Sequence, residues 1–146
     1  MANKNVECQN TGMTLVITYF VFFVVNSLII WLANMLFPAQ VVLGTWYISG
    51  FWAIIHSMGT LALINTFTIP FVRDTEKKRD KMLSKNEWMV VCFLINVAGV
   101  WLIARKANQF GMGIKSWLVA VILGLVFGVV QTMAMMQVEK CRKKCC

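Results

Sequence analysis

Residues 13–37 read MTLVITYFVFFVVNSLIIWLANMLF, and they lie within the longest part of the chain that carries no charged side chain. No Asp, Glu, Lys or Arg occurs anywhere from Cys8 to Val72. Because a helix crosses the roughly 30 Å of membrane hydrocarbon with about 20 residues, an uncharged run of this length predicts two crossings. Pro38 marks the break between them, since proline lacks a backbone donor and disfavours helix in the residue before it.

Two shorter uncharged stretches follow, at 88–104 and at 116–138. Each has the length of one crossing. Ser84 and Glu87 have the spacing of a capping box and indicate where the third helix begins. The sequence therefore predicts an all-α, polytopic membrane protein that forms a single domain over residues 1–146. Its four transmembrane helices are expected at about 13–37, 45–69 (ended by Pro70), 85–104 and 117–137.

The composition agrees with a membrane protein. Of the 146 residues, 59% are hydrophobic and 14% are charged, whereas soluble domains carry about 25% charged residues. A soluble protein of this size cannot bury so much apolar surface, which argues against a soluble enzyme and against a disordered chain. The first apolar stretch is much longer than the apolar core of a signal peptide, so we expect it to be a retained helix.

The basic residues predict the orientation in the membrane. The linker at 73–87 carries six Lys and Arg, the tail at 138–146 carries four, and the segment before the first helix carries one. The 105–115 loop on the opposite side carries three. The positive-inside rule therefore favours a cell-membrane protein with both termini and the 73–87 linker in the cytoplasm, by eleven basic residues against three.

The two halves of the chain share a weak pattern. An Asn and a Trp are five residues apart in Asn26–Trp31 and again in Asn96–Trp101. A Trp and a Gly are seven residues apart in Trp52–Gly59 and again in Trp117–Gly124. We expect two tandem helical hairpins, related as a parallel repeat by an axis along the membrane normal.

The predicted fourth helix carries small residues at every fourth position. Such a face lets two helix backbones approach closely, which favours helix association in lipid. It predicts either packing within one chain, for which residues 49–60 of the second helix are a suitable partner, or a seam between copies of the chain. The face consists of Ser116, Ala120, Gly124, Gly128 and Thr132.

A polar layer is expected near the middle of the membrane. Asn26, His56 and Asn96 fall at similar depth in the first three helices, and His56 is the only histidine in the chain. Polar groups in lipid face the bundle interior and can mark functional sites. The interpretation that we favour is a histidine that joins the helices by bonding to an asparagine. A pore-lining role is the alternative, and metal ligation has little support without a second histidine.

The carboxyl tail combines basic residues with cysteines. We expect its cations to contact anionic lipid headgroups, because each is worth about 1 kcal/mol near the surface. Cys141, Cys145 and Cys146 leave two alternatives open, a partial zinc site and lipidation, while a reducing cytoplasm argues against disulfides. The cations are Lys140, Arg142, Lys143 and Lys144.

No catalytic or cofactor-binding motif is recognisable. The chain has no phosphate loop, nucleophile elbow, zinc-protease motif or Cys-x-x-Cys pair. The 73–87 linker mixes acidic and basic residues, which does not favour nucleic-acid binding. We therefore expect no enzymatic activity, no cofactor and no nucleic-acid partner. The expected partners are the lipid bilayer and either a second copy of the chain or another membrane protein.

The repeated pattern resembles a known group of proteins. Asn26–Trp31, Pro38 and the Gly44-Thr45-Trp46 turn are followed by Asn96–Trp101 and Gly111-Met112-Gly113-Ile114. This arrangement is similar to the small four-helix membrane proteins labelled phage-holin-like, including the mycobacterial four-helix holins. The resemblance implies a non-enzymatic protein whose copies assemble through small-residue helix faces and open the bilayer.

Two other functions fit the residues. One is an accessory or structural membrane subunit that recruits a partner or anionic lipid through its cytoplasmic linker and basic tail. The other is a small channel or carrier that uses the predicted layer of Asn26, His56 and Asn96.

Overall fold

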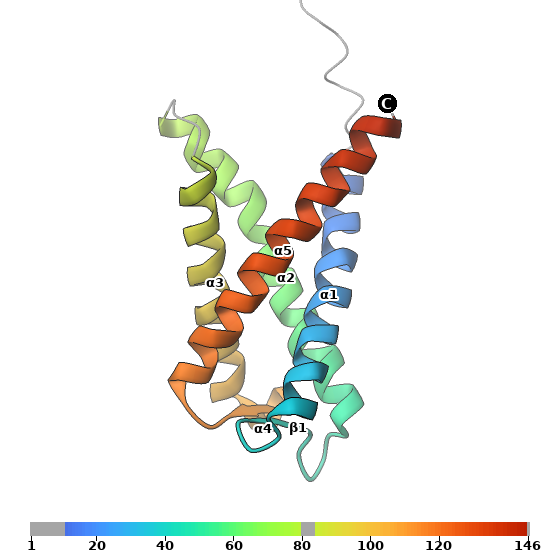
Figure 1. Cartoon of the computed structure of the whole chain (residues 1–146), viewed down its shortest axis with the longest axis vertical. Coiled ribbons are helices and arrows are strands. Elements are labelled where there is room, and N and C mark those ends of the chain that lie inside the picture. Colours follow the sequence, from blue (N-terminus) through green and yellow to red (C-terminus); the bar gives the residue numbers. More distant parts are fainter. Residues whose placement is uncertain (1–10, 80–83, 146) are drawn as a thin grey trace, which may run out of the picture.

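The computed structural model describes residues 11–79 and 84–145, which form a bundle of long helices (Figure 1). Within these residues the structure is all-α apart from two short strands, and four of its helices are long and apolar enough to span a membrane. In chain order the elements are α1 (Thr11–Leu36), β1 (Val41–Leu43), α2 (Gly50–Arg79), α3 (Lys85–Arg105), α4 (Ala107–Phe110), β2 (Met112–Ile114) and α5 (Trp117–Cys145).

The four-span architecture predicted from the sequence is confirmed. The apolar spans cover Gly12–Leu36, Gly50–Val72, Asn86–Arg105 and Trp117–Gln137. The predicted capping box also forms at the start of α3. The Ser84 hydroxyl accepts from the Asn86 N–H at 3.4 Å, and the Glu87 carboxylate accepts from the Ser84 N–H at 2.7 Å.

Two helices continue beyond the ends of their predicted spans. Helix α2 continues through Pro70 as far as Arg79, although proline was expected to end it. Pro70 lies on the exposed side of α2. Ile69 before it and Val72 after it are both buried in the bundle, and their packing keeps the helix continuous through the proline. Helix α5 likewise continues through the predicted tail, because residues 138–145 contain no Gly or Pro and are rich in the helix formers Lys, Arg and Glu.

The strands β1 and β2 close one end of the bundle. They pair in antiparallel fashion, with Val42 opposite Gly113, and so join the α1–α2 connection to the connection that precedes α5. Gly44 and Gly111 lie at the end of β1 and the start of β2, with φ of +97° and +74°, and the Gly44 N–H donates to the Gly111 carbonyl at 2.7 Å. No signal in the sequence is strong enough to predict strands this short.

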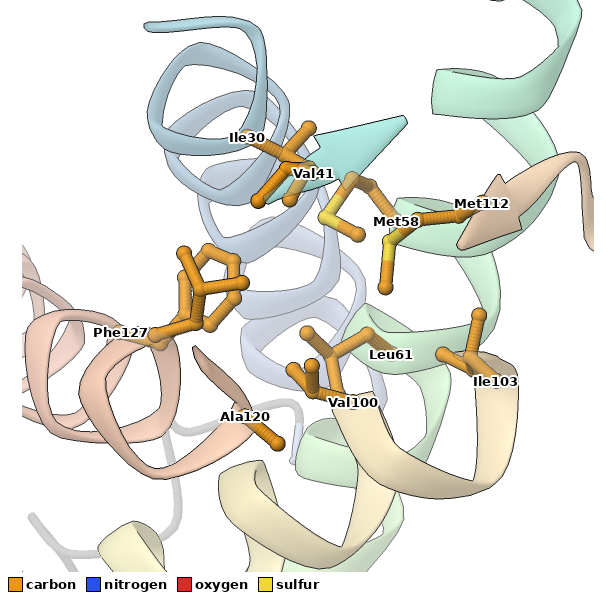
Figure 2. Packing of buried hydrophobic residues seen from close by; sticks show 10 residues of the cluster. Ile30, Val41, Met58, Leu61, Val100, Ile103, Met112, Ala120 and Phe127 are labelled. Carbon is orange, nitrogen blue, oxygen red and sulfur yellow. The ribbon is translucent and has the colours of Figure 1, made fainter. Parts of the chain in front are cut away.

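The hydrophobic core lies next to this closed end, where strand residues meet residues from all four long helices (Figure 2). The most extensive helix contacts are those within each hairpin, of α1 with α2 and of α3 with α5. Toward the opposite end, α2 and α5 cross in the view of Figure 1 and then diverge. The core cluster consists of Ile30, Val41, Met58, Leu61, Val100, Ile103, Met112, Ala120, Leu123 and Phe127.

Candidate functional site at the centre of the bundle

Four side-chain amides meet at the centre of the bundle, one from each long helix. They belong to Asn26 on α1, Asn65 on α2, Asn96 on α3 and Gln131 on α5, and all four residues are buried. We call this group the amide cluster. Its position within four apolar spans makes it the most prominent polar feature of the described residues that would lie in the membrane.

The three shortest hydrogen bonds of the amide cluster run in one direction. Asn65 Nδ2 donates to Asn96 Oδ1 at 2.8 Å, and Asn96 Nδ2 donates to Gln131 Oε1 at 2.9 Å. Gln131 Nε2 then donates to Asn26 Oδ1 at 2.8 Å. Each amide except the last therefore gives a hydrogen bond to the next. Such chains polarise their members and strengthen each bond, most of all where the dielectric constant is low.

Asn26 ends this chain with an unused donor. Its Nδ2 is buried and has no hydrogen-bond partner among the described residues. Reversing the amide would not help, because Nδ2 would then face the Nε2 donor of Gln131. A buried donor without a partner costs about 1–3 kcal/mol, so the other bonds of the cluster must offset this cost.

The structure brings Asn26 and Asn96 of the predicted polar layer together, whereas the prediction that His56 lies with them is wrong. Asn26 and Asn96 both belong to the amide cluster and are joined through Gln131. His56 is exposed, and its Nδ1 lies 3.0 Å from the carbonyl oxygen of Trp52 on its own helix. The buried face of α2 contains Ser57 and Leu61, which turns His56 toward the surroundings of the bundle. His56 therefore neither joins the helices nor lines a path between them.

Asn65 and Gln131 are the cluster members that the sequence analysis missed. Both are uncharged polar residues within apolar spans, and that signal was present in the sequence. They also occupy related places in the proposed repeat, six residues after Gly59 and seven residues after Gly124. The predicted layer is centred on the depth of His56, and it leaves out Asn65 because that residue lies nine positions further along α2.

The small-residue face of α5 packs against α3 in the same chain. A Cβ atom on Gly124 would lie 2.9 Å from the backbone nitrogen of Val97, so only glycine fits there. Gly128 faces the backbone of Phe93, and Ala120 is buried in the core. The face therefore serves packing within one chain. The suggested partner at residues 49–60 of α2 is wrong, because α3 occupies this position.

The corresponding glycine of the first hairpin also faces a neighbouring helix, but with ordinary contact distances to side chains. A Cβ atom on Gly59 would lie 3.6 Å from Tyr19 Oη and 3.8 Å from the ring of Phe23, both on α1. In each hairpin, the second helix (α2 or α5) thus turns a glycine toward the first helix (α1 or α3).

Two charged helix ends lie at the end of the bundle opposite the strands (Figure 1). In α2, Asp74 and Lys78 form an exposed ion pair of 2.9 Å, which contributes little to stability. In α5, the backbone of Lys140, Arg142, Lys143 and Lys144 is helical. The headgroup contact expected of their side chains lies outside what the structure describes, as do the side chains of Cys141, Cys145 and Cys146.

Neither a metal centre nor a known relative points to a function. No group of three His, Cys, Asp or Glu among residues 11–79 and 84–145 is placed to hold a metal ion. Comparison with models of known protein families, with characterised proteins and with solved structures gives no significant match. The resemblance to phage-holin-like proteins therefore stays a prediction.

Proposed function

We propose that this chain is a non-enzymatic accessory membrane protein that works as a folded four-helix unit and binds anionic lipid headgroups at one membrane surface. The observation that carries the proposal is that α2 and α5 both continue as helices beyond their apolar spans. The spans end at Val72 and Gln137, whereas the helices end at Arg79 and Cys145. At 1.5 Å per residue, each extension is roughly 10 Å long.

These two extensions, residues 73–79 and 138–145, are the basic helix ends. The first contains four basic and two acidic residues, and the second contains four basic residues and one acidic residue. Because a basic residue close to an anionic surface contributes about 1 kcal/mol, their combined excess is enough to favour anionic headgroups. The predicted orientation places both ends at the cytoplasmic leaflet, where anionic lipids are found.

The packing of α5 favours this accessory role over holin-like self-assembly. For copies of the chain to assemble through the small-residue face, α5 would first have to leave α3, exposing Gly124 and Val97. The central part of that face, Ala120, Gly124 and Gly128, is therefore buried and unavailable to a second copy while the bundle is folded. We accordingly expect the protein to leave the bilayer intact.

We also propose that the chain arose as two copies of one hairpin unit. A twofold axis along the membrane normal would make equivalent strands antiparallel, which is how β1 and β2 pair. Gly59 and Gly124 each face the first helix of their own hairpin, which supports the same relation. The axis would place the two basic helix ends on one side of the membrane, as the proposed function requires.

Lipid retention tests the proposed function. The purified protein, in detergent with phosphatidylglycerol and phosphatidylcholine, is examined by native mass spectrometry. We expect bound phosphatidylglycerol to fall at least threefold in the double variant Lys143→Gln, Lys144→Gln. The matched double variant Lys106→Gln, Lys115→Gln removes the same charge at the strand end and should retain the lipid. Equal retention by both variants and the native chain would overturn the proposal.

Regulated expression in bacteria separates this role from membrane opening. We expect the membrane potential, read with a voltage-sensitive dye, to be preserved at high expression. Collapse of the potential in the native chain, but not in a chain that fails to insert, would favour the holin-like alternative.

A further inference from the structure

A small cavity adjoins the amide cluster. Its volume is about 30 Å³, which is room for a water molecule. Residues of α1, α2, α3 and α5 line it, among them Asn65 and Gln131 of the cluster. Its other walls include Trp88, one turn into α3, and Met135 of α5, so it lies on the side of the cluster toward the basic helix ends.

The polar residues around this cavity offer acceptors. No donor bonds Asn65 Oδ1 among the described residues, although its Nδ2 is used. Thr68 and Thr132, which also line the cavity, donate their hydroxyl protons to the carbonyls of Ile64 and Gly128. Their hydroxyl oxygens keep free lone pairs. A polar ligand here must therefore be small and must donate hydrogen bonds.

We propose that this cavity is a water-binding site within the membrane-spanning part of the bundle, with Asn65 Oδ1 as its principal acceptor. Asn65 is the first donor in the chain of amides, and its own Oδ1 is free to accept. A water molecule that donates to this oxygen therefore adds one more donor before Asn65. The sequence of donors then runs from water through Asn65, Asn96 and Gln131 to Asn26. A water molecule has two protons to donate, so it can bond to Asn65 Oδ1 and, with its second proton, to one of the two threonine hydroxyl oxygens.

The position of the cavity explains why water can occupy it. The apolar core lies on the strand side of the amide cluster, where the helices and strands pack together. On the other side, α2 and α5 diverge (Figure 1). Trp88 and Met135 remain partly exposed there, so the cavity is closed less completely toward the basic helix ends. This inference is independent of lipid binding, because none of the basic residues lines the cavity.

Cys92 is a natural probe, since it lines the cavity and is partly buried. The other four cysteines are changed to serine (Cys8, Cys141, Cys145 and Cys146). The chain in lipid vesicles is treated with methyl methanethiosulfonate, a small neutral reagent that dissolves in both water and lipid. Because the thiolate is the reactive form and needs water to form, the reaction rate reports hydration at the thiol.

The matched control places a thiol on the lipid-facing side of the same helix. It carries Leu94→Cys and Cys92→Ser, since Leu94 is 57% exposed on the bundle surface. We expect Cys92 to react at least tenfold faster than this control thiol. Equal rates would overturn the proposal, because they would mean that the cavity is dry.

A second substitution tests the proposed acceptor. Asn65→Leu should lower the reaction rate of Cys92 at least fivefold, and Thr68→Val, which preserves the shape of the side chain, should lower it less. If Asn65→Leu does not fold, as judged by circular dichroism and gel filtration, Thr68→Val alone decides the question. An unchanged rate in the folded variants would overturn the role of these acceptors.

Discussion

Asn96 on α3 and Gln131 on α5 form a reciprocal pair of side-chain amides. Asn96 Nδ2 donates to Gln131 Oε1 at 2.9 Å, while Gln131 Nε2 lies 3.4 Å from Asn96 Oδ1. The same Gln131 nitrogen donates to Asn26 on α1 at 2.8 Å, so one side chain connects three helices. The pair therefore fixes the relative depth of the helices, since sliding α5 by one turn of about 5.4 Å would break every bond of Gln131.

The first prediction concerns Gln131. Gln131→Leu leaves Asn96 Nδ2 and Asn26 Oδ1 without their present partners. We expect it to lower the free energy of unfolding by about 2 kcal/mol or more, because each buried unpaired polar group costs about 1–3 kcal/mol. Unfolding by sodium dodecyl sulfate, followed by circular dichroism, measures this change. Met133→Leu, on the exposed side of the same helix, is the control and should alter stability little.

The second prediction separates two glycines of α5. Gly124→Ala would bring a Cβ to 2.9 Å from the Val97 nitrogen, so α3 and α5 must move apart. We expect a loss of about 1–3 kcal/mol, as is usual for overpacking. Gly128→Ala finds its nearest atom at 3.6 Å, an ordinary contact. It should be neutral or should stabilise the helix by up to about 1 kcal/mol. Equal destabilisation by the two changes would contradict the described α3–α5 packing.

The third prediction concerns His56. His56→Ala removes an exposed ring whose hydrogen-bonding contact is with its own helix at Trp52. We expect a change in the free energy of unfolding within about 0.5 kcal/mol, as is common for surface substitutions. Asn96→Ala, within the amide cluster, should cost considerably more, because Asn65 and Gln131 lose their partner. A larger loss for His56→Ala than for Asn96→Ala would restore the predicted histidine-containing layer.

The fourth prediction tests the strand pair. Val42 and Gly113 are directly opposite each other in the antiparallel ladder, where facing Cα atoms are about 4.5–5.5 Å apart. In a chain whose native cysteines are replaced by serine, Val42→Cys with Gly113→Cys should form a disulfide on mild oxidation. Gel mobility before and after reduction detects the bond.

The register supplies the control for this crosslink. Leu43 faces Met112 and is offset by two residues from Ile114, so Leu43→Cys with Ile114→Cys should crosslink much less. Efficient crosslinking of the offset pair, or none in the facing pair, would contradict the register of β1 and β2.

The sequence by itself determined the four spans and the start of α3. Span length depends on the local balance of apolar and charged residues, and the bilayer demands about 20 apolar residues in any fold. The capping box of Ser84 and Glu87 is equally local, because both partners lie within one helical turn. These features needed no knowledge of which helix lies beside which.

Tertiary structure alone decided which residues meet. Asn26 and Gln131 are 105 positions apart in the chain, and only the folded bundle brings their amides together. The same applies to the choice of α3 as the partner of Gly124, and to the burial of Ile69 and Val72 that carries α2 past Pro70. Because the membrane helices are apolar on all faces, the sequence does not indicate which face of a helix meets which neighbour. Close packing and the need to satisfy each buried polar group decide the partners.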